Sequence, residues 1–366
     1  MNCFRDPYPE VEIDLDKLRE NLAAVIDRCH DSLVEVWPVV KGASALPEVA
    51  RVFADCGVKY LCTSRLDQVR SMQAAGIETP MMLIRIPMLS EVPSVVSLCA
   101  GSLESDITVL RALNAEAGRQ GKTHGVLLMQ DLGDLREGWW SAEELTDAAV
   151  EVENELKNLH LLGVGTNLSC YGSVKPDKRN MQGLVSLAHD VEQAIGRPLE
   201  YVSGGASTSM HMVLGGTMPY RVNNLRLGEI VLLGQTDFAA PDFLHKDVFT
   251  LRAEVVECRS KPSHPVGQLA TDAFHRTRTY VDRGIRRRAL LGVGRVDYGD
   301  CEDIFPRMPG VEVLGASSDH TILDVEDAAE EIKVGDVLEF NLDYASMVFL
   351  TASRGVTVRF KGGSAK

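Results

Sequence analysis

The sequence lacks the patterns that mark disulfide-linked and metal-binding proteins. Its 8 cysteines are scattered through 366 residues without a Cys-x-x-Cys pair, and its 9 histidines show no His-Glu-x-x-His spacing. In a chain of this length, dispersed cysteines indicate reduced thiols and not structural disulfides. The spacing therefore predicts no disulfide framework and no structural zinc, and we expect no bound metal.

Long apolar runs and an excess of positive charge are also absent. No stretch reaches the roughly 18 apolar residues of a membrane span, and residues 1–10 are polar and interrupted by prolines, unlike a signal peptide. The net charge of −14 disfavours nucleic acid and anionic lipid as partners, because both require a basic surface. We therefore expect a cytoplasmic protein that binds a small molecule and neither membrane nor nucleic acid.

Strand-like and helical patterns alternate over the first two thirds of the chain. The apolar, strand-like runs lie at residues 34–40, 58–64, 81–86, 101–106, 125–131, 160–166, 200–204 and 223–228. Helical patterns separate them, for example at residues 47–54, 66–75 and 142–156. Such alternation is typical of a parallel (β/α)8 barrel of the TIM type, in which the carboxyl ends of the strands form the active site.

The pattern changes after residue 245 to short β-type runs bounded by glycine, proline and aspartate. This change predicts a C-terminal antiparallel β domain. We expect a barrel at residues 1–245 and a β domain at 246–366, with residues 1–15 as a segment that either domain could take. Arg286, Arg287 and Arg288 form one compact basic run, which indicates a solvated face or a clamp for an acidic neighbouring strand.

Lys41 follows the apolar run of the first barrel strand. At a buried strand end its ammonium is partly removed from water, which lowers the pKa and favours the uncharged amine. An uncharged amine can bond to an aldehyde as a Schiff base. The same position also suits a lysine that only marks the strand end and extends its charged tip into water.

Four further strand ends carry polar residues. The Ser-Gly-Gly-Ala-Ser-Thr-Ser run at residues 203–209 could bind an anion such as phosphate, or could be a simple turn. Arg226 could complete a phosphate site or form a rim salt bridge, and Arg136 could bind a carboxylate or pair with the acids beside it. Residues 167–171 add an amide, a thiol and a phenol. Because all lie at one end of the barrel, we interpret them as a single site.

Six stretches carry a resemblance to a known family. They lie at residues 37–41, 83–88, 131–138, 167–172, 203–205 and 315–320. The chain resembles the alanine racemase superfamily of fold type III pyridoxal-phosphate enzymes and, within it, the ornithine racemase branch, over nearly the whole length. The resemblance implies a racemase that uses pyridoxal 5'-phosphate to interconvert the L and D enantiomers of ornithine or a related cationic amino acid.

The resemblance also implies a role for each matching residue. Lys41 would hold the cofactor and act as one acid/base, and Arg226 would face the pyridine nitrogen. Arg136 would face the substrate carboxylate together with Ser318 and Asp319 of a partner subunit, which implies a homodimer with shared active sites. The other cofactor-binding residues implied are Asn167, Ser203, Gly205, Ala206, Ser207, Gly228, Glu229 and Tyr344.

Three positions depart from the family pattern. Ala45 stands where the family has a phosphate-binding tyrosine, and Met129 stands where it has a modified lysine whose carbamate orients Arg136. Arg295 replaces the catalytic tyrosine. Because arginine is a poor general base at neutral pH, we expect the second acid/base to lie elsewhere.

Cys170 is the candidate for that second acid/base. It ends a barrel strand, and a nearby Arg136 or Arg226 would lower the pKa of its thiol toward neutrality. The alternative is a cysteine that only packs in the core. The other candidates are Tyr298, Asp319 and His320. The acids that could pair with a cationic substrate side chain, or equally with the two arginines, are Asp134, Glu137, Glu229 and Asp272.

Two other functions are known on the same scaffold. A D-amino-acid lyase or dehydratase of this fold typically needs a metal pair near the C-terminus, for which Asp319 and His320 are the candidates here. A non-catalytic pyridoxal-phosphate carrier resembles the barrel alone, so the β domain argues against it.

Overall fold

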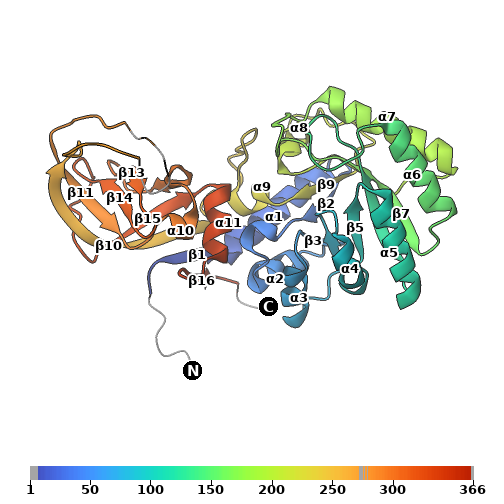
Figure 1. Ribbon diagram of the computed structural model, residues 1–366, viewed down its shortest axis with the longest axis horizontal. Coiled ribbons are helices and arrows are strands. Elements are labelled where there is room, and N and C mark those ends of the chain that lie inside the picture. The colour runs from blue at the N-terminus through green and yellow to red at the C-terminus, as the bar shows by residue number, and fades with distance from the viewer. Residues whose placement is uncertain (1–6, 272–274, 276, 278, 364–366) are drawn as a thin grey trace. The chain divides into compact units, whose positions relative to one another are not determined.

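The computed structural model describes residues 7–271, 275, 277 and 279–363. The chain forms two compact units, Leu15–Lys246 and a second unit made of Met1–Asp14 with Asp247–Lys366 (Figure 1). The predicted fold class is confirmed, since one unit holds an 8-stranded parallel sheet and the other a mainly antiparallel sheet. None of the helices in the described part of the chain is long and apolar enough to cross a membrane.

The barrel strands appear at all eight predicted places. In sheet order they are β2 (Glu35–Pro38), β9 (Asn224–Leu227), β8 (Tyr201–Ser203), β7 (Leu159–Gly165), β6 (His124–Met129), β5 (Gly101–Glu104), β4 (Met81–Leu83) and β3 (Leu61–Thr63). The ring closes between β2 and β3, where Val39 bridges Cys62 and the Val40 N–H donates to the Cys62 carbonyl at 2.9 Å.

Apolar side chains fill the barrel. The buried cluster consists of Trp37, Val39, Cys62, Met82, Leu103, Leu127, Met129, Leu162 and Tyr201. Because side chains alternate along a strand, Leu103 in this cluster places its β5 neighbours Ser102 and Glu104 on the opposite face, toward the surrounding helices. Both are fully buried there, and Glu104 is the last residue of β5, so the barrel wall holds a buried ionisable group at the carboxyl end of that strand, on the helix-facing side.

Helices surround the barrel, and α4, α5, α6 and α7 are seen outside the strands in Figure 1. Their bounds are α1 (Leu15–His30), α2 (Pro47–Asp55), α3 (Leu66–Ala74), α4 (Val92–Leu98), α5 (Ile107–Gln120), α6 (Ala142–Asn154), α7 (Lys178–Ile195), α8 (Met210–Leu214) and α9 (Glu229–Leu233). Side-chain caps start the longer ones: the Asp106 carboxylate accepts from the Thr108 N–H at 2.7 Å, and Asp177 accepts from Asn180 at 2.8 Å.

The second unit contains the amino-terminal strand as well as the chain after residue 246. Its elements are β1 (Glu10–Asp14), β10 (Phe249–Pro262), β11 (Ile285–Leu291), α10 (Arg295–Tyr298), β12 (Ile304–Pro306), β13 (Glu312–Ala316), β14 (Thr321–Asp324), β15 (Val337–Leu342), α11 (Tyr344–Ala352) and β16 (Thr357–Lys361). The central order is β12-β15-β10-β11-β14-β13. β1 pairs antiparallel with β10 and parallel with β16, so it belongs to this sheet.

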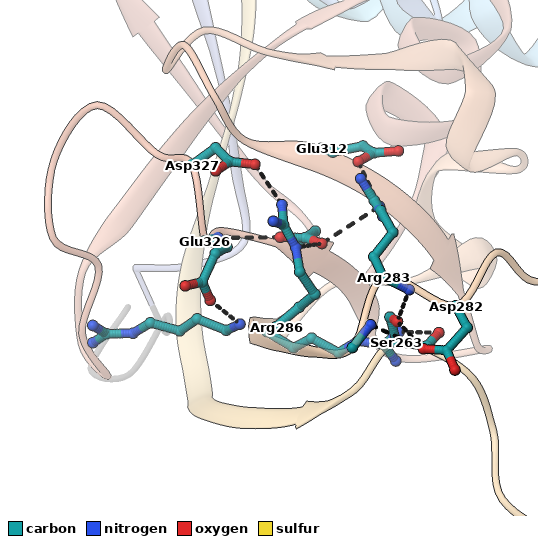
Figure 2. A network of polar contacts seen from close by, with 11 residues as sticks. Ser263, Asp282, Arg283, Arg286, Glu312, Glu326 and Asp327 are labelled. Atoms are coloured by element: carbon teal, nitrogen blue, oxygen red, sulfur yellow. Dashed lines mark hydrogen bonds and ion pairs between the residues drawn. The ribbon is translucent and has the colours of Figure 1, made fainter.

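The arginine run on β11 meets acids of the neighbouring strand β14 and the turn after it. Arg286 donates from Nε to Asp324 Oδ2 at 2.9 Å and also contacts Asp327, while Arg283 reaches Glu312 at 2.8 Å (Figure 2). The interpretation of this run as a clamp for an acidic strand is confirmed for Arg286.

Candidate active site

Lys41 lies at the carboxyl end of β2, where it begins the short 3-10 helix η1 (Lys41–Ala43). The Ser44 N–H donates to the Lys41 carbonyl at 3.1 Å, and the Ala45 N–H donates to the Val40 carbonyl at 3.0 Å. Ser44 and Ala45 both have left-handed backbones, with φ of 50° and 49°, which non-glycine residues rarely adopt. Lys41 is therefore presented on a tightly bent turn.

The pKa of Lys41 is lowered as expected from its position. Burial is the main cause, and the positive charges of Arg136 and Arg226 act in the same direction. Cys170 and Glu137 oppose them. The amine and the two guanidinium groups of the predicted site therefore lie close enough to interact electrostatically, and Cys170 and Glu137 lie with them.

Arg226 is almost completely buried on β9. Its Nη2 donates to the Thr166 carbonyl at 2.7 Å and to Asn167 Oδ1 at 2.8 Å, and its Nη1 donates to Ser203 Oγ. Burial lowers the pKa of Arg226 to about 10, so the group remains a cation at neutral pH. These three bonds are made by the two terminal nitrogens and do not involve the Nε–H, which could donate to a bound molecule.

The loops after β8 and β9 are bonded to each other. Ser207 Oγ accepts the N–H groups of Gly228 at 3.1 Å and Ile230 at 3.2 Å, so the hydroxyl proton of Ser207 remains available for an anion. Gly205 has a left-handed φ of 103°, and a Cβ there would lie 3.1 Å from Ser209 Oγ. Backbone and hydroxyl donors of this kind suit a phosphate. The adjoining predicted contacts, Ala206 and Glu229, flank Ser207 and Gly228.

Asp134 holds the loop after β7 in place. Its buried carboxylate accepts four backbone N–H groups, from Ser169 at 3.0 Å, Cys170 at 3.1 Å, Tyr171 at 3.0 Å and Val174 at 3.1 Å. Burial raises the pKa of Asp134, but these bonds outweigh it and the net pKa is lowered. The prediction that Asp134 could pair with a substrate amine is therefore wrong, because both carboxylate oxygens are used by the backbone.

Arg136 forms a local ion pair with the next residue. Its Nε lies 2.8 Å from Glu137 Oε2, and the other carboxylate oxygen of Glu137 accepts from the Asn167 amide. Asn167 in turn accepts from Arg226. Of the alternatives for Arg136, this structure shows the pair with a neighbouring acid. The link through Asn167 was not predicted, because no spacing in the sequence indicates it.

Cys170 lies near Lys41 and Arg136 as predicted, but the expected direction of its pKa shift is wrong. Cys170 is exposed, which excludes a cysteine that only packs in the core, yet partial loss of hydration raises the pKa of its thiol, and the opposing effects of Arg136 and Lys41 are smaller. The two positive charges therefore do not compensate for lost hydration. At neutral pH the Cys170 thiol keeps its proton.

Two residues near the C-terminus prove unsuited to proton transfer. Tyr298 is fully buried in the second unit, its hydroxyl lies 2.6 Å from Thr321 Oγ1, and burial raises its pKa to about 12. Arg295 pairs with Asp300 at 3.0 Å. Burial disfavours its charge, but the bond and charge of Asp300 prevail and raise its pKa. Tyr298 is thus removed as an alternative base.

The remaining predicted residues lie in the second unit. Ser318 and Asp319 form the turn between β13 and β14, which is closed by the Ser317 N–H donating to the His320 carbonyl at 2.9 Å. Tyr344 begins α11. Asp272 lies outside the described residues. Within the described ranges, no group of three or more His, Cys, Asp or Glu side chains could hold a metal.

Comparison with known proteins places this arrangement in a family. Residues 13–236 match the family model described as "Alanine racemase, N-terminal domain". The chain is 37% identical over 343 residues to an ornithine racemase of Acetoanaerobium sticklandii, covering 93% of this chain and 96% of the relative. It is 35% identical to a lysine racemase of Thermotoga maritima over 93% of this chain and 95% of the relative.

A solved structure shares the fold. The crystal structure of alanine racemase from Streptomyces lavendulae matches with a TM-score of 0.74 at 19% identity and covers 98% of both chains. Members of this family depend on pyridoxal phosphate. The matches extend through both units, and the chain therefore belongs to the alanine racemase family of amino-acid racemases.

Proposed function

We propose that this protein is a pyridoxal-phosphate-dependent racemase of ornithine or a related cationic amino acid. The observation that carries the proposal is the partly buried amine of Lys41, whose pKa is lowered by lost hydration and by two guanidinium groups at the carboxyl end of the barrel. A site that binds pyridoxal phosphate covalently requires such an amine. The two cations suit the phosphate of the cofactor and the carboxylate of the substrate.

The residues present fit the cofactor. Lys41 would bind its aldehyde carbon, and the Nε–H of Arg226 would face its ring nitrogen. Ser207 and the backbone of the loops at residues 203–207 and 228–229 would hold its phosphate. When bound, pyridoxal phosphate would withdraw electrons from the substrate and make the Cα proton acidic.

Two side chains are suited to move that proton. Lys41 has a lowered pKa and can accept the proton from Cα, while Cys170 has a raised pKa and can deliver one. Racemisation requires these two actions on opposite faces of Cα, and in the reverse direction the two residues exchange roles. Arg136 would bind the substrate carboxylate and so limit rotation about Cα.

Support for a cationic substrate comes from the two relatives, one an ornithine racemase and one a lysine racemase. Among the acids considered for its amine, Asp134 is bound by the backbone and Glu137 by Arg136 and Asn167. The other candidates are Glu229, which also has an interaction partner, and acids of a partner subunit.

We further propose a homodimer whose partner contributes Ser318 and Asp319 to each site. Three large apolar side chains in the loops after β6 and β7 support it, because Leu135, Trp140 and Tyr171 are all largely exposed. Apolar residues gathered around a polar site in this way commonly mark a protein interface.

The test uses the purified protein with pyridoxal phosphate. We expect a visible absorption band, and borohydride reduction should fix the cofactor on Lys41. Chiral chromatography should then show racemisation of ornithine and lysine at much higher kcat/KM than alanine, and Lys41→Ala should lose both band and turnover. A label on another lysine would contradict the site, and equal kcat/KM for alanine and ornithine would contradict the substrate class.

A further inference from the structure

Two guanidinium groups of the site are joined by an unbroken chain of side-chain contacts. Arg136 Nε lies 2.8 Å from Glu137 Oε2, and Glu137 Oε1 accepts from Asn167 Nδ2. Asn167 Oδ1 then accepts from Arg226 Nη2 at 2.8 Å. One carboxylate and one amide therefore connect Arg136, after β6, with Arg226, on β9.

Glu137 is the residue on which this chain depends. Its side chain is only 15% exposed, and each carboxylate oxygen has a different partner. Met129, which precedes the loop, is apolar and fully buried, so it offers Arg136 no acceptor. Within the described part of the chain, Glu137 is the one acid that forms an ion pair with Arg136.

Asn167 makes the connection directional. Its amide nitrogen donates to Glu137 while its amide oxygen accepts from Arg226, so the carboxylate on one side and the guanidinium on the other fix the orientation of the amide. A reversed amide would place two donors together at Arg226 and two acceptors together at Glu137. The position of Arg226 is thereby coupled to the charge of Glu137.

We propose that Glu137 is a positioning residue that orients Arg136 for the substrate carboxylate and, through Asn167, steadies Arg226. The roles of the two arginines rest on the proposed function, but the contacts between them do not. Glu137 therefore acts through its contacts with Arg136 and Asn167, and it does not bind the substrate side chain.

Replacing Glu137 by glutamine should break this chain. Both carboxylate oxygens face N–H donors, and the glutamine NH2 group must replace one of them, which brings two donors together at Arg136 or at Asn167. The matched control is Glu153→Gln. Glu153 on α6 pairs with Arg197 at 2.7 Å and is 25% exposed, but it has no contact with the site.

Steady-state kinetics are the first measurement. We expect Glu137→Gln to raise KM for the amino acid about tenfold to a hundredfold, the effect of losing one charge-assisted hydrogen bond, with a smaller change in kcat. Glu153→Gln should change neither constant. Equal kinetics for the two variants would overturn the proposal, as would a Glu137→Gln enzyme that loses only its preference for ornithine over norvaline.

Arginine labelling gives a second measurement that needs neither cofactor nor turnover. In cofactor-free protein, phenylglyoxal followed by peptide mass spectrometry should label Arg136 faster in Glu137→Gln than in wild type or Glu153→Gln. Unchanged labelling would overturn the proposal even if activity fell. If the wild type proved inactive, the proposed function would fail, while the labelling would still decide whether Glu137 orients Arg136.

A double-mutant cycle tests the link to Arg226. The KM effects of Glu137→Gln and Asn167→Ala should be less than additive, because either change breaks the same chain. The pH at which the bound cofactor changes its visible spectrum should shift in both single variants and remain constant in Glu153→Gln. Additive effects, or a spectrum unaffected by Glu137→Gln, would contradict the coupling.

Discussion

Glu104 in the barrel wall makes the stability of this protein dependent on pH. The carboxyl is fully buried, Ser102 donates to its Oε1, and Oε2 has no partner among the described residues. Ser102 Oγ also lies 2.9 Å from His124 Nε2. Burial raises the pKa of Glu104 to about 8, against the effect of the Ser102 bond, and burial lowers the pKa of His124 to about 4.

The two shifts change the free energy of unfolding in opposite directions as the pH changes, and their intervals overlap between pH 4.5 and pH 6.5. Folded Glu104 binds its proton more tightly than the unfolded chain does, so its contribution is complete below pH 4.5 and is lost as the pH rises to about 8. At ~1.4 kcal/mol for each pH unit, this interval corresponds to at most ~5 kcal/mol. His124 acts oppositely, because stability is lost as the pH falls from 6.5 to about 4.

The substitution Glu104→Gln should remove the loss of stability that Glu104 causes as the pH rises and keep the loss that His124 causes as the pH falls. Glutamine is neutral throughout, so the stability of the variant relative to wild type should rise by up to ~4 kcal/mol between pH 5 and pH 9. Urea unfolding at each pH, monitored by tryptophan fluorescence, measures the difference in free energy of unfolding between the variant and the wild type. All 3 tryptophans, Trp37, Trp139 and Trp140, lie in the barrel unit, so the signal reports on the right part of the chain.

An exposed glutamate provides the control. Glu78→Gln alters a solvated carboxylate in a surface loop. Its free energy of unfolding should differ from that of the wild type by the same amount at every pH in this range. If the difference in free energy of unfolding between Glu104→Gln and the wild type did not change with pH, the reasoning would be refuted. The same would hold for a wild-type barrel that becomes more stable between pH 6 and pH 9.

Three further outcomes are expected. Cys170→Ser, assayed in deuterated water in both directions, should lose solvent exchange from one enantiomer while exchange through Lys41 persists; unchanged rates in both directions would exclude the thiol as an acid/base. Mixed dimers of Lys41→Ala and Asp319→Ala chains should regain part of the activity, and verified heterodimers without activity would argue for sites built from single chains. Gly294→Ala should destabilise the second unit by ~1–3 kcal/mol, because its Cβ would lie 2.2 Å from a backbone oxygen. Gly183→Ala on α7, with open space around the new Cβ, should not destabilise, and equal thermal unfolding of the two would contradict this.

The positions of the site residues could be predicted because they follow from periodicity. Apolar runs locate the strands, and parallel strands bring their carboxyl ends together, so Lys41, Arg136 and Arg226 could be assigned to one end of the barrel. The strand β12 and the helix α11 were not predicted. Three residues are too few to show a strand pattern, and an apolar helix such as α11 has little amphipathic periodicity.

The state of these residues could not be predicted, because it depends on competing effects in three dimensions. The thiol of Cys170 has cations nearby, yet burial determines its pKa. Asp134 and Glu137 are similar acids three positions apart, but backbone amides bind the first, and Arg136 and Asn167 bind the second. Neither partner set can be deduced from composition or spacing.

The pairing of β1 with β16 has a consequence for how the protein is made. β1 is synthesised before the barrel and β16 after it, yet the two are neighbouring strands of one sheet, with Ile13 opposite Phe360. The barrel lies between them in the chain and can fold during synthesis, whereas the second unit is complete only once β16 has also been synthesised. A fragment that starts at residue 247 would lack the strand between β10 and β16, so the second unit should not be separable by a single cut.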